Sequence, residues 1–384
     1  MQYHQIRKID LHLPLVFMLV LSFYGLIRCS EPIHVQSLIV QSQNMELRYE
    51  SQNLLQKDDT LELYLNEVLG KLATEQELDS FHLRARVLRS RSINAFATPH
   101  GTIYVCTGIM ARMTSEAQLA ALLAHELIHV LNHHSEKNLI RMKESSQSHA
   151  EARIGLGVLL GDGISGAITG AALKSAVTGY SRDLEREADS LGLKRMMHAG
   201  YPAKEFLQLF KILQEHLISE NIKEPYFFST HPLIEERIAN YYSIIGKNTS
   251  DIAASDSAVD VFGMRAREVV LYDARVNHAA GRPDLAGYQV ERLLDMDTSD
   301  VQSLVLMGDI ERQISPQSTE SIRWYKKALE NDSLYPAALR GVAFVSYTLG
   351  QFGVAREYFE KYCQVVPDAF DIKMVKEYMA RCAH

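Results

Sequence analysis

The chain has few cysteines and no excess of positive charge. Its 384 residues include four cysteines, and no two of them form a C-x-x-C pair. The sequence therefore gives no sign of a cysteine-based zinc or redox site. The 40 lysines and arginines are outnumbered by 47 aspartates and glutamates, which gives a formal net charge of −7. This balance does not favour nucleic acid as a partner, because such partners need a basic surface.

Long hydrophobic runs are scarce as well. No uninterrupted apolar run reaches the ~20 residues of a membrane-spanning helix. The run Leu13–Ile27 has 15 residues and follows Arg7 and Lys8, as the core of a signal peptide follows its cationic lead. We expect residues 1–30 to be a signal peptide or an N-terminal anchor that sends the rest of the chain out of the cytoplasm. A cleaved leader, a leader lipidated at Cys29 and a retained anchor are all compatible with this pattern.

An H-E-x-x-H motif occupies residues 125–129, where the sequence is HELIH. The residues before it predict a helix. Ser115 and Gln118 can form a capping box at its start, and leucines follow at helical spacing. The motif is short enough to occur by chance, so its meaning depends on the rest of the chain.

The spacing of the motif on this helix suggests metal chemistry. His125 and His129 lie one turn apart on one face, so both imidazoles can bind one zinc ion. Glu126 lies beside them and can take a proton from an attacking water molecule. The plainer alternative is that the three residues form the polar face of an amphipathic helix.

A third metal ligand has to come from another part of the chain. Asn132 and Ser135 stand where an extended motif with a third histidine requires glycine and histidine, so that class is excluded. In the predicted helix Tyr180–Gly192, Glu185 and Asp189 are four residues apart and share one face. Glu185 would complete a His₂Glu zinc site, and Asp189 could orient a ligand histidine through its second ring nitrogen. The alternative is a solvated, charged helix face.

Other patterns outline the domain around the motif. Leu61–Leu72 has helical periodicity, Phe81–Leu88 alternates like a strand, and the turn at Pro99–Gly101 predicts a hairpin. One hairpin strand could be an edge to which an extended peptide adds, and a purely structural hairpin is an equal alternative. The glycine-rich segment Ile154–Val177 is expected to form a mobile helical hairpin that touches a membrane or a membrane-bound substrate. A membrane span and a tightly packed hairpin are the alternatives.

The last third of the chain repeats at an interval of 34 residues. Ser321, Tyr325 and Ala328 correspond to Ala355, Phe359 and Tyr362. This pattern is typical of tetratricopeptide repeats, which stack pairs of helices and present a concave face to polypeptides. A generic helical packing domain is the alternative. Cys363 and Cys382 could form a disulfide in an oxidising compartment.

The segments INAFATPHGTIYV, SEAQLAALLAHELIHV and YSRDLEREAD occur in this order. Together they resemble the zinc metallopeptidase family that includes the prenyl-protein proteases and the HtpX-type membrane proteases, over roughly residues 65–245. The resemblance implies a zincin-like fold, one zinc ion per chain and Glu185 as the third ligand.

The resemblance continues through Ser229–Arg237 and implies two further roles. In exported members, the histidine before the proline, here His231, can occupy the open metal position and hold the enzyme latent. Arg237 could place a cation near the developing oxyanion. The alternative for His231 is a loop histidine that caps the next helix.

These observations predict an α+β, mostly helical protein. We expect a zincin-like metalloprotease domain with a small β-sheet at residues 31–250 and a tetratricopeptide-repeat domain at residues 251–384. The combination with an export signal resembles exported family members of Gram-negative bacteria. It implies a periplasmic, membrane-proximal endopeptidase that degrades misfolded or stalled outer-membrane proteins and meets their assembly machinery through the repeats. The alternatives are a chaperone or assembly adaptor, and a membrane-tethered quality-control protease of inner-membrane proteins.

Overall fold

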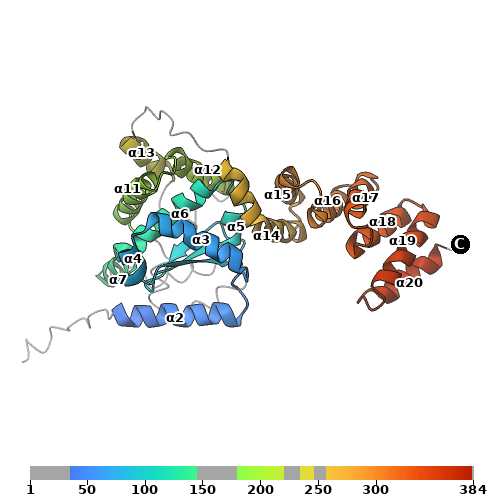
Figure 1. Ribbon diagram of the computed structural model, residues 1–384, viewed down its shortest axis with the longest axis horizontal. Helices are drawn as coiled ribbons and strands as arrows, with labels where there is room; N and C mark the ends of the chain where they lie inside the picture. The colour runs from blue at the N-terminus through green and yellow to red at the C-terminus, as the bar shows by residue number, and fades with distance from the viewer. Residues whose placement is uncertain (1–34, 145–179, 220–233, 246–256, 383–384) are drawn as a thin grey trace, which may run out of the picture.

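The computed structural model of the protein describes residues 35–144, 180–219, 234–245 and 257–382 (Figure 1). Three features expected from the sequence lie outside the described residues: the leader at 1–30, the glycine-rich segment 154–177 and His231. Figure 1 shows a sheet-containing N-terminal half and a helical array that extends away from it.

The N-terminal half packs helices around a three-stranded sheet. Its helices are α2 (Val35–Ser51), α3 (Asp59–Leu72), α4 (Glu75–Ser80), α5 (Thr107–Met110), α6 (Glu116–Leu131), α7 (His134–Glu144), α11 (Arg182–His198), α12 (Lys204–Ser219) and α13 (Ile234–Ile245). Its strands are β1 (Arg84–Leu88), β2 (Ala95–Ala97) and β3 (Thr102–Cys106). The predicted mostly helical architecture with a small sheet is confirmed.

The sheet has the order β1-β3-β2, with β3 parallel to β1 and antiparallel to β2. The predicted hairpin is confirmed, because β2 and β3 are consecutive strands on either side of the turn at Pro99–Gly101. Gly101 has a φ of +92°, and a Cβ there would lie 1.8 Å from the carbonyl oxygen of Phe81, so only glycine fits. The predicted strand at Phe81–Leu88 is confirmed from Arg84 onward.

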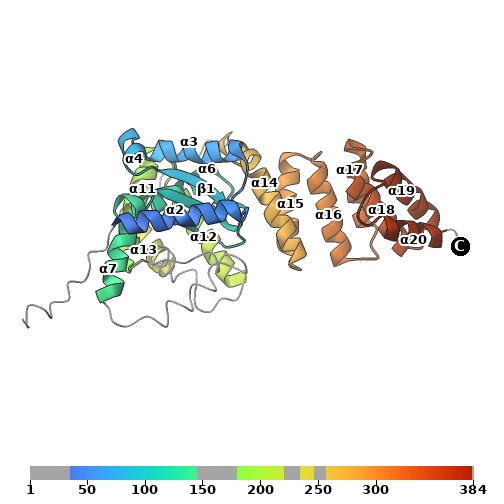
Figure 2. The same cartoon turned by 90° about the horizontal axis from the view of Figure 1, so that it is seen from below.

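Helices cover both faces of the sheet. α2 crosses one face (Figure 2), where the ring of Tyr49 meets that of Tyr104 edge-on with 5.4 Å between their centroids. On the same face, the Glu46 carboxylate binds the guanidinium groups of Arg84 and Arg86. α3 and α6 cover the opposite face, with α3 against β1 and α6 against β2. The motif helix therefore lies on the sheet, beside its β2 edge.

α6 is buried along almost its whole length. Ser115 begins it, since the hydroxyl accepts a hydrogen bond from the backbone N–H of Gln118 at 3.2 Å. The second half of the predicted capping box is not formed, because the Gln118 side chain binds Thr114 and not the Ser115 backbone. The two histidines and the glutamate of the motif are at most 3% exposed. The alternative of a solvated polar face is therefore wrong.

The array begins with a long helix and continues as a row of shorter ones, each packed against the next. Its helices are α14 (Ser257–Ala279), α15 (Pro283–Met296), α16 (Val301–Ile314), α17 (Glu320–Asn331), α18 (Pro336–Thr348), α19 (Phe352–Val365) and α20 (Ile372–Arg381). Tyr325 of α17 is buried between Gly308 and Gly341, where an added Cβ would lie 2.6 Å from its ring. This packing suits paired helices, and the tetratricopeptide assignment stays a prediction.

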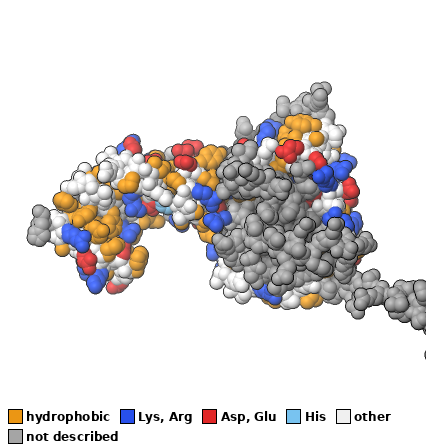
Figure 3. All heavy atoms as spheres, turned by 180° about the vertical axis from the view of Figure 1, so that it is seen from behind, with side chains coloured by type: hydrophobic (Ala, Val, Ile, Leu, Met, Phe, Trp, Pro, Cys, Tyr) orange, Lys and Arg blue, Asp and Glu red, His pale blue; other side chains and the backbone are white. Residues whose placement is uncertain are grey.

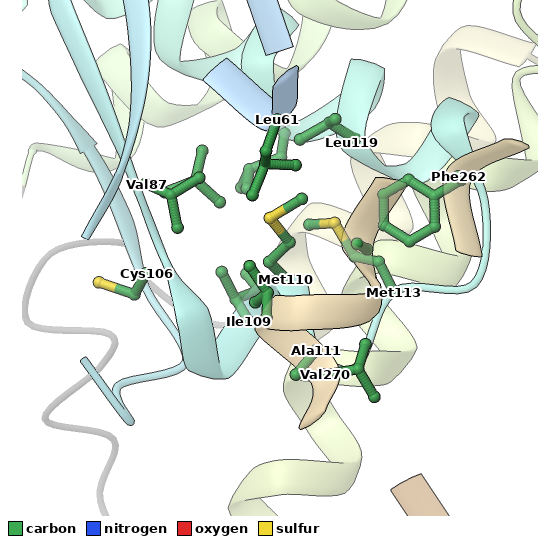
Figure 4. Packing of buried hydrophobic residues seen from close by; sticks show 14 of the residues in the cluster. Leu61, Val87, Cys106, Ile109, Met110, Ala111, Met113, Leu119, Phe262 and Val270 are labelled. Carbon is green, nitrogen blue, oxygen red and sulfur yellow. The ribbon is translucent and has the colours of Figure 1, made fainter. Parts of the chain in front are cut away.

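α14 joins the array to the N-terminal half. It packs on α3, α5 and α6, and Figure 4 shows Phe262 and Val270 of α14 near Met113 in one hydrophobic cluster. Arg292 of α15 strengthens the junction, because its guanidinium donates to the carbonyl oxygens of Ala111 at 2.8 Å and Met113 at 2.6 Å. The hydrophobic core is continuous from one half to the other.

Three other expectations concern the ends and the boundary of the domains. The predicted boundary at residue 250 falls in a segment that the structure does not describe, and it stays a prediction. Cys363 and Cys382 are free thiols, so the disulfide considered from the sequence is not formed. Within the described ranges, none of the helices combines the length and the hydropathy needed to cross a bilayer.

Candidate metal centre

Three buried side chains from two helices bring their donor atoms together. His125 and His129 of α6 and Glu185 of α11 each offer one ligand atom, and these atoms lie within 4.8 Å of one another. The two Nε2 atoms are 3.0 Å apart, and the Glu185 carboxylate lies 3.4 Å from His125 and 3.5 Å from His129. Nitrogen ligands about 2.0–2.1 Å from a tetrahedral zinc ion are about 3.3 Å apart. The observed spacing therefore fits one small metal ion.

The close packing of α6 and α11 produces this geometry. Gly192 of α11 faces the backbone of α6, where an added Cβ would lie 3.1 Å from the carbonyl oxygen of Ala124 and the backbone nitrogen of His125. Gly192 follows Glu185 by two helical turns and so lies on the same side of α11. The glycine lets α11 approach closely enough for the Glu185 carboxylate to reach both histidines.

Asp189 and Arg237 hold the outer side of the His125 ring. The Asp189 carboxylate lies 2.9 Å from Nδ1 of His125. The Arg237 guanidinium donates two hydrogen bonds to the same carboxylate, at 2.9 and 2.6 Å. Burial alone would raise the pKa of Asp189, but Arg237 and His125 outweigh it and hold the pKa below its usual value. Asp189 is therefore an anion beside Nδ1 of His125, and its expected role in orienting a ligand histidine stays a prediction.

The outer nitrogen of His129 is held by a residue that the sequence analysis did not single out. Nδ1 of His129 lies 2.9 Å from Nδ1 of His134, and the Tyr180 ring stacks on that of His129 with 3.9 Å between centroids. His134 reaches this place because α6 ends at Leu131 and His133 adopts a φ of +52°, which reverses the chain into α7. Histidines directly after a motif helix are the signal that could have revealed this contact.

The buried charges around the cluster favour a cation. Glu126, Glu185, Asp189 and Arg237 are at most 6% exposed, and their formal charges leave an excess of two negative charges. A divalent cation would neutralise this excess. Burial and Arg237 lower the pKa of His125, but its hydrogen bonds with Asp189 and Glu185 outweigh both and raise it to about 9. Without a metal, a proton on His125 thus supplies part of the missing positive charge.

Three further residues were predicted to belong to the site: Glu126, Arg237 and His231. Glu126 is on α6 next to His125 and is 1% exposed. Arg237 of α13 is buried against Asp189, and its expected place near the oxyanion stays a prediction. His231 lies outside the described residues, so its proposed contact with the metal stays a prediction.

A cavity of about 360 Å³ opens beside the ligand cluster. His129 and Val130 of α6 line one side, and the other lining residues include Ala97 of β2, Pro99 of the turn that follows β2, and Phe81. In the described part of the sheet, β2 is an edge strand. The cavity therefore connects the ligand cluster with an edge to which a peptide could add.

Comparison with known proteins identifies the domain that carries this site. Residues 59–244 match peptidase family M48. A Vibrio cholerae protein named as a beta-barrel assembly-enhancing protease is 31% identical over 160 residues, 40% of this chain and 33% of the relative. The beta-barrel assembly-enhancing protease of Escherichia coli O157:H7 is 25% identical over 230 residues, 57% of this chain and 46% of the relative. The mitochondrial metalloendopeptidase OMA1 of Schizosaccharomyces pombe is 28% identical over 177 residues, 46% of this chain and 50% of the relative.

The chain thus spans between a third and a half of the length of these relatives. The matched region contains the three residues of the ligand cluster and also Glu126, Asp189 and Arg237. Residues 59–244 therefore form a domain of peptidase family M48, a metallopeptidase family, and the buried His-His-Glu cluster supports a metalloprotease.

Proposed function

We propose that this protein is a zinc-dependent endopeptidase in which His125, His129 and Glu185 bind the metal. The observation that carries the proposal is the convergence of these three buried donors beside Glu126 in a peptidase M48 domain. Two imidazoles and one carboxylate are a donor set of catalytic zinc sites, in which the fourth position is left for water or substrate. When bound, zinc would polarise the scissile carbonyl and increase the acidity of water.

The chain's own residues would supply proton transfer and orientation. Glu126 takes a proton from the attacking water and later delivers it to the leaving amine nitrogen. Asp189 accepts the Nδ1 proton of His125, at 2.9 Å, and so directs the lone pair of Nε2 toward the metal position. Each residue acts at a stated atom, so each role can be removed separately by substitution.

The edge strand and the cavity support a polypeptide substrate. In β2, Phe96 pairs with Tyr104 of β3, which leaves the backbone groups of Ala95 and Ala97 directed away from β3. An extended peptide could add to this edge by main-chain hydrogen bonds and place a side chain in the neighbouring cavity. This arrangement would bring a peptide bond close to His129 and Glu126.

We propose further that the substrates are misfolded or stalled outer-membrane proteins and that the protein works in the periplasm. The names of the bacterial relatives support this substrate class, and the cationic, apolar leader supports export. The array, proposed as tetratricopeptide repeats, would bind unfolded chains or assembly machinery. Hydrophobic side chains lie at its surface (Figure 3), and Phe370, Leu334 and Ile314 are more than half exposed. His231 would mask the metal between rounds of hydrolysis.

A membrane-tethered quality-control protease is the second candidate. The likeness to mitochondrial metalloendopeptidases favours it, because this domain also occurs outside proteins named for outer-membrane assembly. The two candidates share the chemistry of the site and differ in the substrate.

Hydrolysis by purified protein tests the proposal. The wild type should cleave a urea-denatured outer-membrane β-barrel protein, and Glu126→Gln should lower the rate by about 10²–10⁴-fold while keeping the bound zinc. Equal cleavage by both proteins would contradict the role of Glu126. Preferred cleavage of a detergent-solubilised helical membrane protein would favour the second candidate. His231→Ala should raise the rate, and an unchanged or lower rate would contradict masking by His231.

A further inference from the structure

The Arg237 guanidinium is buried and already paired, whereas a group that binds substrate is expected to have free hydrogen-bond donors. This residue, on α13, is 6% exposed. Nε donates to Oδ2 of Asp189 at 2.9 Å, and Nη2 donates to Oδ1 at 2.6 Å. Such a two-point pairing fixes the guanidinium and the carboxylate in one plane. Phe210 of α12 lies under the guanidinium, 4.6 Å from its centre, so Arg237 is held on one face as well as at its edge.

The carboxylate that Arg237 fixes is also the partner of a proposed metal ligand. Oδ1 of Asp189 accepts from Arg237 at 2.6 Å and lies 2.9 Å from Nδ1 of His125. Nη2 of Arg237 is itself 3.3 Å from that Nδ1. Both nitrogens carry protons directed at Asp189 when the ring presents its Nε2 lone pair to a metal. Arg237, Asp189 and His125 thus form a series of hydrogen-bonded side chains that ends at the metal position.

The charges of Arg237, Asp189 and Glu185 indicate that these contacts do more than hold the helices together. Asp189 and Glu185 are buried carboxylates one turn apart on α11, and two such anions repel each other. The positive charge of Arg237 offsets this repulsion, because its guanidinium pairs with Asp189 and lies 4.0 Å from the Glu185 carboxylate. It stabilises the ionised Asp189 without competing for the Nε2 atoms that face the ligand cluster.

We propose that Arg237 is a positioning residue, which acts on the metal through Asp189 and His125 and not by contact with substrate. The inference rests on the proposed zinc site. Partners that orient a ligand histidine typically change metal affinity by about 10–100-fold when they are removed. A residue that binds only the oxyanion would instead change turnover and leave metal affinity unaltered.

The experiment measures zinc affinity by competition with a fluorescent chelator, with Zn²⁺ alone as the probe. Arg237→Gln should weaken zinc binding by about 10–100-fold, and Arg237→Lys, which keeps the charge but loses the two-point pairing, should fall between it and the wild type. In an Asp189→Asn background, Arg237→Gln should add little further loss, because the two residues act as one unit.

Arg195→Gln is the matched control. Arg195 is on α11, the helix of Asp189, and like Arg237 it makes a two-point pair, here with both oxygens of Glu77 at 2.7 Å and not with a residue of the ligand cluster. This variant should lower the melting temperature and leave zinc affinity unchanged. Thermal unfolding of every variant separates a loss of fold from a loss of metal, and Arg237→Lys serves if Arg237→Gln does not fold.

Two results would overturn the inference. The first is an Arg237→Gln variant that keeps wild-type zinc affinity but has a lower kcat, with a loss in kcat that adds to the loss caused by Asp189→Asn. This result would place Arg237 at the oxyanion. The second is an equal loss of zinc affinity in Arg195→Gln, which would reduce Arg237 to a structural anchor. If the wild type itself bound no zinc, the proposed function would be rejected as well, and this result needs no variant to detect it.

Discussion

At the level of single residues, the two proposed ligand histidines differ in what holds their outer nitrogens. His125 has an anionic partner, Asp189, whereas His129 has the imidazole of His134. Burial lowers the pKa of His134 to about 4, so that ring is neutral near pH 7. A neutral imidazole can accept the Nδ1 proton of His129 without adding charge to the site. The two ligands are therefore oriented by a charged and an uncharged partner.

His134→Phe should weaken zinc binding, because it keeps an aromatic ring but removes the nitrogen that orients His129. We expect a loss of about 10–100-fold in zinc affinity, measured by chelator competition. His198→Phe is the matched control, since His198 is an exposed histidine of α11 and is not part of the ligand cluster. Equal zinc affinity in His134→Phe and His198→Phe would show that His134 has no orienting role.

At this level, the sequence predicted which side chains share a helix face where the spacing was local. His125 and His129 are one turn apart on one helix, and Glu185 and Asp189 are one turn apart on another, so both pairs follow from helical periodicity. The partners of Arg237 and His129 do not follow in this way. Arg237 meets a carboxylate 48 residues away, and His134 depends on the positive φ of His133, which a histidine rarely adopts.

At the level of elements, the contact between α6 and α11 determines whether the third ligand reaches the other two. Gly192 allows this contact, with α6 backbone atoms 3.1 Å from where its Cβ would lie. The sequence predicts both helices from their periodicity and caps. It does not predict their separation, because a glycine inside a helix is equally compatible with an exposed position. Gly70 of α3 illustrates this, since nothing lies within 4 Å of its missing Cβ.

Gly192→Leu should push α11 away from α6 and lower both zinc affinity and the melting temperature. We expect a loss of about 1–3 kcal/mol in the free energy of unfolding, as for other overpacked sites. Gly70→Ala is the control and should stabilise the fold by about 0.5–1 kcal/mol, because alanine is the better helix former. Chelator competition and thermal unfolding check both variants. Unchanged zinc affinity in Gly192→Leu would contradict the importance of this contact.

The start of α6 is tied to its surroundings by Glu116. Its carboxylate accepts hydrogen bonds from Tyr64 at 2.9 Å, Lys71 at 2.7 Å and Tyr201 at 2.6 Å. Burial raises the pKa of Glu116, but these donors outweigh burial and lower the pKa below its ordinary value of 4.5. Stability from a lowered carboxyl pKa is fully present above the unfolded value and is lost as the pH falls through the folded value.

Glu116→Gln should therefore destabilise the protein at pH 7 by about 1–2 kcal/mol. The difference in melting temperature between variant and wild type should shrink as the pH falls below about 4.5, the ordinary glutamate pKa. Thermal unfolding between neutral and acidic pH measures it. A difference that stays constant over this range would show that the ionised carboxylate is not the stabilising group.

At the level of the whole molecule, the array is part of the same packed body as the metalloprotease domain. α14 contributes Phe262 and Val270 to the core beside α5 and α6, and Arg292 of α15 binds two backbone carbonyls just before α6. The helical character of this part was predictable from its 34-residue periodicity. Its docking was not, because the contacts join residues about 180 positions apart in the chain.

Arg292→Ala should loosen this junction, because it leaves the carbonyl oxygens of Ala111 and Met113 without their donor. We expect a loss of about 1–3 kcal/mol in the free energy of unfolding. Arg323→Ala is the control, since Arg323 is mostly exposed and its ion pair among the described residues is with Glu320 on its own helix. Such an exposed pair contributes about 0.5 kcal/mol or less. Denaturant unfolding compares the two variants. A similar small loss in both would mean that Arg292 does not join the two halves.

The central claim is that one zinc ion is bound by His125, His129 and Glu185. Its most direct test is metal analysis by mass spectrometry of the purified wild type beside Glu185→Gln. The wild type should carry about one zinc per chain, and the variant, which keeps the shape but not the charge of the third donor, should lose most of it. A wild type without zinc, or a variant that keeps the full amount, would contradict the claim.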